Sequence, residues 1–264
     1  MAGRALKRQR RHVRSVILAR LALLLVLWGA WEALAASGLL FRDVVPSASA
    51  VLPALLRLLG RPDFYPNLAT TLAEVAAALL IGAPLGAAIG LALGLHRFTG
   101  RMLEPYLHYL APTPKIILLP ILLELFGVGP PSKIALGALS CFFPVALSLA
   151  AGAREVDPVL LRVGHSFHLS PAQMVRKIYA PALVRPIATG LRLGFGVAFV
   201  GCLLAETTLA EHGLGFIAIN DYRQFAIPEM YAVLLVVFAI AAAGNWLASG
   251  LARLGGPAER AGNG

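Results

Sequence analysis

Apolar residues in this chain gather in long runs instead of alternating with polar residues. Each run is near or above the ~20 residues that a helix needs to cross the hydrocarbon core of a membrane. The runs predict six membrane-spanning helices, at residues 16–37, 68–95, 103–127, 132–152, 186–208 and 230–253. Such runs, without strand or amphipathic-helix periodicity, are typical of an all-α membrane protein with several spans.

The same pattern divides the chain into four parts. We expect a basic N-terminus at 1–15, the first span with its outer connection at 16–67, a core of five spans at 68–253, and a tail at 254–264. The first run could instead be a signal peptide, because "ALAA" follows it. Trp28 and Trp31 favour a retained helix, since tryptophan often anchors a span at the membrane interface.

Charge changes the picture by giving an orientation. The net charge of +10 would suit a nucleic-acid partner, but no basic face with interleaved aromatic residues is found. The basic residues cluster beside predicted spans, in the first twenty residues, in the "HRFTGR" turn and at 153–185. Cytoplasmic connections carry such clusters. We therefore expect membrane lipid and no nucleic acid as a partner, with both termini in the cytoplasm.

Two connections on the expected outer side differ in charge. The 206–229 connection holds more acidic than basic residues, as expected for an outer segment. The 38–67 connection carries Arg42, Arg57 and Arg61 against two aspartates, and it departs from the pattern.

Four glycines recur at every fourth residue of the second span. Gly82, Gly86, Gly90 and Gly94 share one helix face, on which a second backbone can approach closely. The pattern predicts a helix-packing seam. It contains no information about what the protein transports.

The third span contains a break. Prolines at 112, 114 and 120 surround Lys115 and remove backbone donors from the helix. Opened backbone at membrane depth is tolerated where it packs in protein or lines a wet cavity.

Charged residues within spans are costly and usually face a pathway or a partner. We select Lys115, Glu124 and Glu206 as candidates for a translocation path. Lys115 could meet an anionic solute, or it could reach the interface or form a structural pair. Glu206 is expected to flank an outer gate loop with Gly213 and Gly215.

Residues 157–181 are too polar to span a membrane and predict two short capped helices. Asp157 precedes Pro158 as an N-cap, and Ser170 stands in capping-box register with Gln173. Apolar residues at helical spacing follow each cap. An amphipathic helix lying on lipid is the alternative to a module that docks into a partner protein.

This stretch, "DPVLLRVGHSFHLSPAQMVRKIYAP", resembles the cytoplasmic coupling loop of ATP-binding-cassette (ABC) importer permeases. Their signature runs E-A-A, three residues, G, nine residues, I, one residue, L-P. The isoleucine and proline match Ile178 and Pro181, whereas Arg162 replaces the acid and His168 the glycine.

Three further stretches, "LLPILLELFGVGPPSKIALGALSCFFPVALSLAAGAREVDP", "TGLRLGFGVAFVGCLLAE" and "GLGFIAIN", are similar to the nitrate/sulfonate/taurine branch of these permeases. The resemblance covers roughly residues 45 to 250.

The resemblance implies a type I ABC importer permease fold in a bacterial inner membrane, with a coupling loop at 154–182. It also implies partners: a second permease copy or a paired permease, two ABC ATPase subunits and an extracytoplasmic substrate-binding protein. The residues that it places in ATPase docking are Asp157, Leu160, Arg162, Val163, Gly164, Phe167, His168, Ser170, Ile178 and Pro181.

The solute implied is a small anion, namely a sulfonate, taurine or nitrate, although bicarbonate or a thiamine-precursor pyrimidine would also fit the branch. Where the family has glycine, His168 is expected to adopt a positive φ. Arg162 reverses the charge of the family's acid, so its pairing with the ATPase must differ here.

The sequence offers no enzyme chemistry. The nearest approach to a phosphate-binding loop, "GVGPPSK", lacks the glycine before lysine, and no nucleophile–base pair or metal cluster is found. We expect no cofactor on this chain and ATP hydrolysis in a partner subunit. A stand-alone secondary transporter or channel, and a non-transporting membrane scaffold, are the alternative functions.

Overall fold

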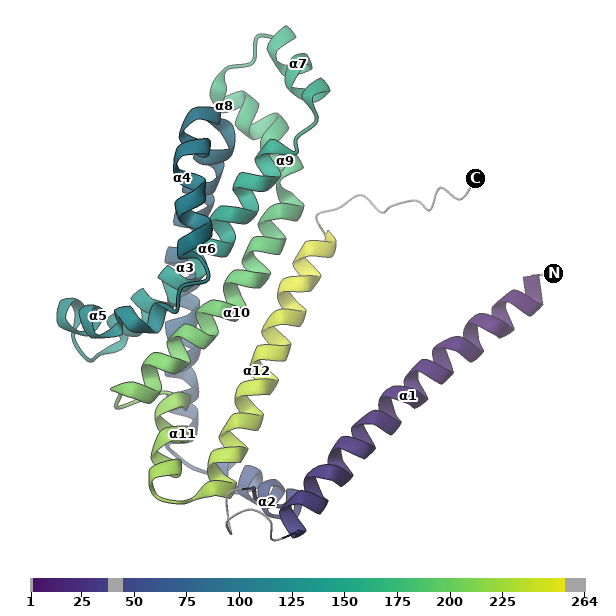
Figure 1. Cartoon of the computed structure of the whole chain (residues 1–264), viewed down its shortest axis with the longest axis vertical. Helices are drawn as coiled ribbons and strands as arrows, with labels where there is room; N and C mark the ends of the chain where they lie inside the picture. The colour runs from purple at the N-terminus through teal and green to yellow at the C-terminus, as the bar shows by residue number, and fades with distance from the viewer. Residues whose placement is uncertain (1, 38–44, 255–264) are drawn as a thin grey trace.

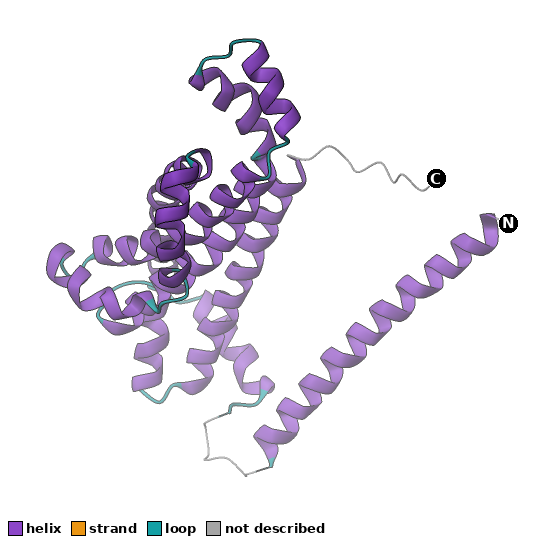
Figure 2. Ribbon diagram, turned by 45° about the horizontal axis from the view of Figure 1, so that its top comes forward, coloured by secondary structure: helices purple, strands orange, loops and turns teal. Residues whose placement is uncertain are grey.

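The computed structural model of the protein describes residues 2–37 and 45–254. In these two ranges every regular element is a helix (Figure 2). Five helices are long and apolar enough to span a membrane: α1 (Ala2–Ala36), α3 (Phe64–Leu95), α6 (Pro130–Arg154), α10 (Val184–Thr208) and α12 (Ile227–Leu254). The bent helix pair Phe98–Leu110 and Lys115–Phe126 brings the number to six if its two helices count as one broken span. The predicted all-α membrane fold is confirmed.

Helix α6 lies at the centre of the bundle, with α3 on one side and α10 on the other (Figure 1). Buried apolar residues of these three helices form the middle of the core, among them Ala78, Cys141 and Ala198. Helix α12 packs on α10 and on α11 (Leu214–Arg223). Helix α6 itself lies between two long apolar helices, α3 and α10.

The glycines of α3 all face α6. A Cβ added to Gly86 would lie 2.6 Å from the carbonyl oxygen of Phe142, and one added to Gly94 would lie 3.0 Å from that of Ala150. Gly82 and Gly90 lie equally close to the α6 backbone. Because no β-carbon separates the two helices along this seam, their backbones make direct contact.

The third span is bent by 92° between α4 (Arg97–Leu110) and a short helical segment at Lys115–Phe126. That segment begins with a 3-10 turn, η1 (Lys115–Leu118), and continues as α5 (Leu119–Phe126). Pro112 and Pro114 lie in the bend, where they cannot donate to the preceding turn. Pro120 opens α5 and takes no part in the break.

Helix α2 (Ala48–Leu59) lies at the end of the bundle with α11 (Figure 1), and the arginine within it and the arginine just after it are both paired. Arg57 Nη2 is 2.7 Å from Glu229 Oε1, and Arg61 Nη2 is 2.7 Å from Asp63 Oδ2. The hydrogen bond from Arg61 lowers the pKa of Asp63. Arg61 also lies beside Asp221, whose pKa is raised by burial. These pairs offset the arginines that departed from the charge pattern; Arg42 lies outside the described residues.

Helix α1 diverges from the bundle and touches it at its C-terminal end (Figures 1 and 2). The Trp31 indole N–H donates to the Pro46 carbonyl at 2.9 Å, and its ring meets Tyr231 edge-on with centroids 5.5 Å apart. Both contacts fix this end of α1 beside α2 and α12.

We expect Gly86→Ala to lower the melting temperature of the detergent-purified protein. The added methyl group would overlap the α6 backbone, and overpacking of this kind costs about 1–3 kcal/mol. The matched control is Gly196→Ala in α10, where no atom lies within 4 Å of the added carbon. Equal melting temperatures for the two variants would contradict the seam.

Candidate functional site

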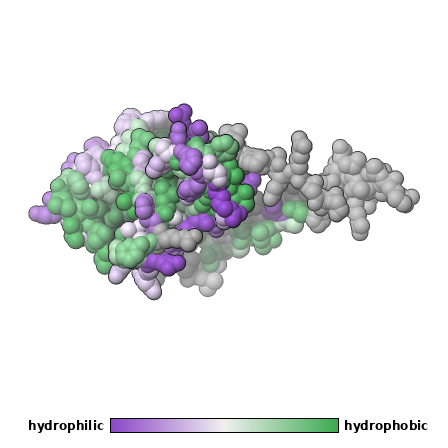
Figure 3. All heavy atoms as spheres, turned by 90° about the horizontal axis from the view of Figure 1, so that it is seen from above, coloured by the Kyte–Doolittle hydropathy of each residue, from purple (hydrophilic) through white to green (hydrophobic). Residues whose placement is uncertain are grey.

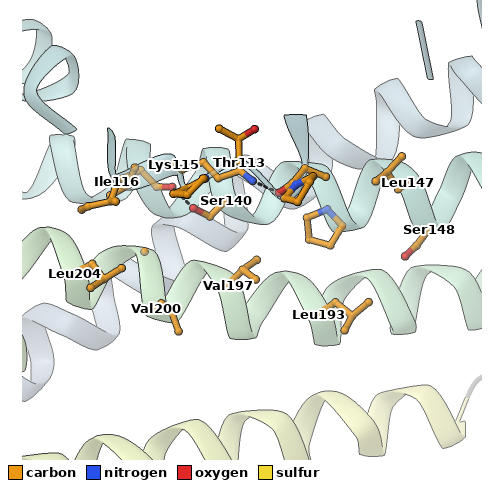
Figure 4. A pocket seen from close by; sticks show the side chains of 16 residues that line it. Thr113, Lys115, Ile116, Ser140, Leu147, Ser148, Leu193, Val197, Val200 and Leu204 are labelled. Atoms are coloured by element: carbon orange, nitrogen blue, oxygen red, sulfur yellow. Dashed lines mark hydrogen bonds between the residues drawn. The ribbon is translucent and has the colours of Figure 1, made fainter. Parts of the chain in front are cut away.

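A groove of about 530 Å³ opens between the α4–α5 bend, α6 and α10. Figure 4 shows its labelled residues along facing helices: Leu193, Val197, Val200 and Leu204 from α10, with Ser140, Leu147 and Ser148 from α6. Thr113, Lys115 and Ile116 complete the groove at the bend. Its walls are therefore mostly apolar, with three hydroxyl groups and one cation.

Lys115 lines this groove and also binds the end of α4. Its Nζ donates to the carbonyl oxygen of Ala111 and, at 3.3 Å, to that of Leu110. Nζ also lies 4.7 Å from the centroid of the Phe143 ring. The carbonyls lost their usual partners at the proline bend, so the ammonium group caps them.

Capping does not neutralise Lys115. Among the described residues no carboxylate forms an ion pair with it. A carbonyl removes no charge, so a positive charge remains at the wall of a largely apolar groove, where it attracts an anion more strongly than in water. The structure thus shows a structural contact for Lys115 and places it on the groove wall, while its position on a translocation path stays a prediction.

Glu206 does not line the groove. Its side chain is fully buried, with Oε1 accepting from Thr71 Oγ1 at 2.7 Å and Oε2 accepting from the Gly215 N–H at 2.7 Å. Thr71 also accepts from the Leu214 N–H at 2.8 Å. These bonds fasten the connection between α10 and α11.

The glycines of that connection fit this role. Gly213 has φ +113°, a conformation that glycine adopts freely, and its N–H donates to Asn67 Oδ1 at 2.6 Å. A side chain on Gly213 or Gly215 would overlap Glu206. The predicted neighbourhood of Glu206, Gly213 and Gly215 is therefore present as a closed, hydrogen-bonded connection.

Two more ionisable residues lie beside Glu206. Glu74 is 2% exposed and interacts with Glu206, while its Oε2 has no hydrogen-bond partner in the described part of the chain. Lys133 is 3% exposed, and its Nζ donates to the carbonyls of Val128 and, at 3.1 Å, Gly129. Two buried carboxyl groups thus share the field of one lysine.

Sequence reasoning missed Lys133 and did not place Glu74. The available signal was a lysine at the start of the apolar run 132–152 and an acid, Glu74, within the apolar run 68–95. Glu74 and Lys133 line a small polar cavity of about 300 Å³. Glu124, the remaining path candidate, is exposed on α5 and lines neither this cavity nor the groove.

The segment 157–181 folds as the two capped helices predicted. Helix α7 (Pro158–Ser166) begins after Asp157, whose side chain accepts from the Val159 N–H at 2.7 Å. Helix α8 (Pro171–Met174) begins with a complete capping box between Ser170 and Gln173. His168 has φ +50°, so the left-handed residue expected between the helices is confirmed.

After α8 the chain forms a π-helical turn, η2 (Val175–Tyr179), and a last turn, α9 (Ala180–Ala182). The sequence analysis did not anticipate this turn. Pro181 cannot donate to the carbonyl four residues earlier, and a π-turn accommodates such a missing bond. We name residues 157–182 the elbow.

Most of the expected docking residues are exposed on the elbow. Leu160, Val163 and Phe167 form an apolar stripe at α7, with between 46% and 75% of each residue exposed. The polar members are also accessible, namely Asp157, Arg162, His168 and Ser170, as is Pro181.

Gly164 and Ile178 have a different place. Gly164 is buried, and a Cβ there would meet Met174 and the end of Ile178. These residues hold the two helices of the elbow together, while the stripe and the polar rim remain accessible.

Comparisons with known proteins agree with this geometry. A family profile described as "Binding-protein-dependent transport system inner membrane component" matches residues 66–260. The taurine transport system permease protein of Escherichia coli is 32% identical over 227 residues, covering 84% of this chain and 81% of that protein. Another Escherichia coli protein, described as a transport permease for aliphatic sulfonates, is 30% identical over 210 residues, covering 80% of each.

A solved structure shares the fold. An inward-facing form of the MetNI methionine ABC transporter superposes with a TM-score of 0.61 at 19% identity, covering 77% of this chain and 98% of that chain. The ABC importer permease fold expected from the sequence is therefore confirmed.

We expect Thr71→Val to destabilise the protein by about 1–3 kcal/mol, because Glu206 and the Leu214 N–H would each lose a buried partner. Thermal unfolding in detergent measures this loss. The control is Thr70→Val, whose hydroxyl donates only to Pro66 within its own helix. An unfolding temperature that is the same for both variants would argue against the cluster as a clamp.

Proposed function

This chain belongs to the family of binding-protein-dependent transport system inner membrane components, and we propose that it carries a small sulfonate-type anion inward along the groove beside Lys115. It is a multi-pass permease subunit of an ATP-driven importer. Permeases of this class work in pairs with ATPase subunits. The solute, the pairing and the docking contacts below are our proposals.

The uncompensated charge of Lys115 carries the proposal for the solute. A sulfonate has one negative charge spread over three oxygens, which the ammonium group can meet. The Thr113 and Ser140 hydroxyls already donate to the carbonyls of Tyr109 and Leu136, so Ser148 provides the further hydroxyl donor on the groove wall. The apolar walls provide no second cation to hold the anion, which suits a path that must release its solute. Relatives described as taurine and aliphatic-sulfonate permeases support the same class.

The open side of the groove supports a paired arrangement. Residues of the bend and α5 beside it are apolar and exposed, including Ile117, Ile121 and Leu125. We propose that a second copy of this chain faces the groove, so that the two copies enclose one path. An extracytoplasmic binding protein would deliver the solute to the end that carries α2 and α11.

The elbow is proposed as the docking site for a separate ATPase that binds and hydrolyses ATP. Its exposed stripe offers apolar contact, and its capped helices are rigid enough to transmit movement to α6 and α10. Arg162 is exposed, so the ATPase groove must present an acidic or neutral group to it. The elbow and both termini would then lie in the cytoplasm, in agreement with the basic residues at 153–185.

We expect Phe167→Ala to weaken association with the partner ATPase at least tenfold, which corresponds to about 1.4 kcal/mol. Its ring is 75% exposed at the end of the apolar stripe, and buried aromatic anchors dominate such interfaces. Co-purification and titration of the detergent-solubilised permease with the ATPase measure the effect.

The matched control is Phe225→Ala, which removes a ring that is 86% exposed between α11 and α12. Undiminished ATPase binding by the Phe167 variant would remove the elbow's apolar stripe from the docking surface. Uptake that persists without any ATPase would instead favour a stand-alone transporter.

Lys115→Gln is expected to reduce sulfonate uptake at least tenfold, whereas Lys115→Arg should retain most of it. Glutamine can still donate to the α4 carbonyls but lacks the charge. Uptake into proteoliposomes that contain the ATPase and the binding protein is the measurement, with taurine, an alkanesulfonate, nitrate and bicarbonate as competing solutes. Equal uptake by the glutamine variant would exclude Lys115 from the path.

A further inference from the structure

A second polar cavity, of about 350 Å³, lies at the end of the bundle that carries the elbow. It is enclosed by the last residues of α3, by Arg101 of α4, by Arg154 of α6, and by Leu161 and Tyr179 of the elbow. The cavity is therefore lined by both the spans and the elbow, which lie at the same end of the bundle (Figure 1). Seen from this end, the surface shows groups of hydrophilic side chains among hydrophobic ones (Figure 3).

The charged groups around this cavity leave a positive excess. Arg154 pairs with Glu104, and Arg101 has no ion-pair partner in the described part of the chain. One guanidinium charge is thus uncompensated, and the Tyr179 hydroxyl provides a further donor.

Gly100 makes room for the second guanidinium. A Cβ at this buried position would lie 2.9 Å from Arg154 Nη2. Any larger residue would push the arginine away from α4. Arg154 can therefore lie across the helix and stay within reach of both Glu104 and the cavity.

We propose that this cavity binds a phosphate-type oxyanion, either the headgroup phosphate of an anionic lipid or a free phosphate. Guanidinium groups offer planar, paired N–H donors that match phosphate oxygens. Basic pockets between spans on the cytoplasmic side are known places for anionic headgroups. A bound phosphate would connect Arg101 and Arg154 of the spans to Tyr179 of the elbow.

The surface next to the cavity favours a lipid as the source. Phe98, Met102 and Tyr106 follow one another at four-residue spacing on α4 and are half exposed or more. An acyl chain can lie along this strip while its phosphate occupies the cavity. Free phosphate would gain nothing from the strip.

The test uses the purified full-length chain in detergent, with native mass spectrometry to count retained lipids. The chain is exposed to an equal mixture of phosphatidylglycerol and phosphatidylcholine. We expect wild type to retain phosphatidylglycerol preferentially and Arg101→Gln to lose at least fivefold of that preference. Arg101 has no ion-pair partner to lose, so its replacement should leave the fold intact.

The matched control is Arg176→Gln, which removes an exposed arginine of the elbow that does not line the cavity. Tyr179→Phe, which removes one hydroxyl, should give a smaller loss than Arg101→Gln. Competition by millimolar inorganic phosphate, lost in Arg101→Gln, would support the same site with a free anion as its ligand.

Equal phosphatidylglycerol retention in wild type and in the Arg101 variant would overturn the proposal. Equal loss in the Arg101 and Arg176 variants would also overturn it, because the effect would then be general surface charge. Neither readout requires transport or an ATPase, so this failure is distinguishable from failure of the proposed function.

Discussion

The direct backbone contact between α3 and α6 is the constraint on which the rest of this structure depends. In a membrane, apolar side chains gain little free energy by exchanging lipid contacts for contacts with one another, because both are apolar. Membrane helices therefore associate through close packing. The glycines at 82, 86, 90 and 94 provide that packing along one full face of α3. With α6 held in this way, its other face meets α10 through Gly194, whose added Cβ would lie 2.8 Å from Cys141 Sγ.

Helix α6 then determines where each functional element lies. Lys133 at its beginning belongs to the buried cluster, Ser140 and Ser148 line the groove, and Arg154 at its end reaches the elbow. Its 25 residues span about 38 Å. The buried carboxyls of Glu74 and Glu206 are costly in a membrane, and the bonds of Glu206 fix the connection between α10 and α11. The end of the bundle with α11 is thereby held by buried hydrogen bonds, while the elbow is held mainly by packing around Gly164.

Features with a local cause could be predicted from the sequence. Run length gives the spans, the missing N–H groups of Pro112 and Pro114 give the bend, and side-chain caps give the elbow helices. Features that depend on which distant faces meet were missed. Lys133 acquires its place only because α3 and α10 bring two carboxyls to it, and Gly164 is a packing residue only because α7 and η2 fold together.

The bend at Lys115 joins two helical segments, α4 and α5, that are held on α6 in different ways. Glu104 of α4 pairs with Arg154 of α6, so the elbow end of α4 is tied to α6. Helix α5 lies beyond a 92° bend and has no such ion pair in the described residues. Helix α5 is held on α6 by apolar packing instead, with Leu119 buried against Leu136. Lys115 caps α4 from the first turn after the bend, so its charge lies between a segment held by an ion pair and one held by packing. If the groove carries an anion as proposed, a movement of α4 relative to α6 would change the distance from this charge to Ser148 on the facing wall.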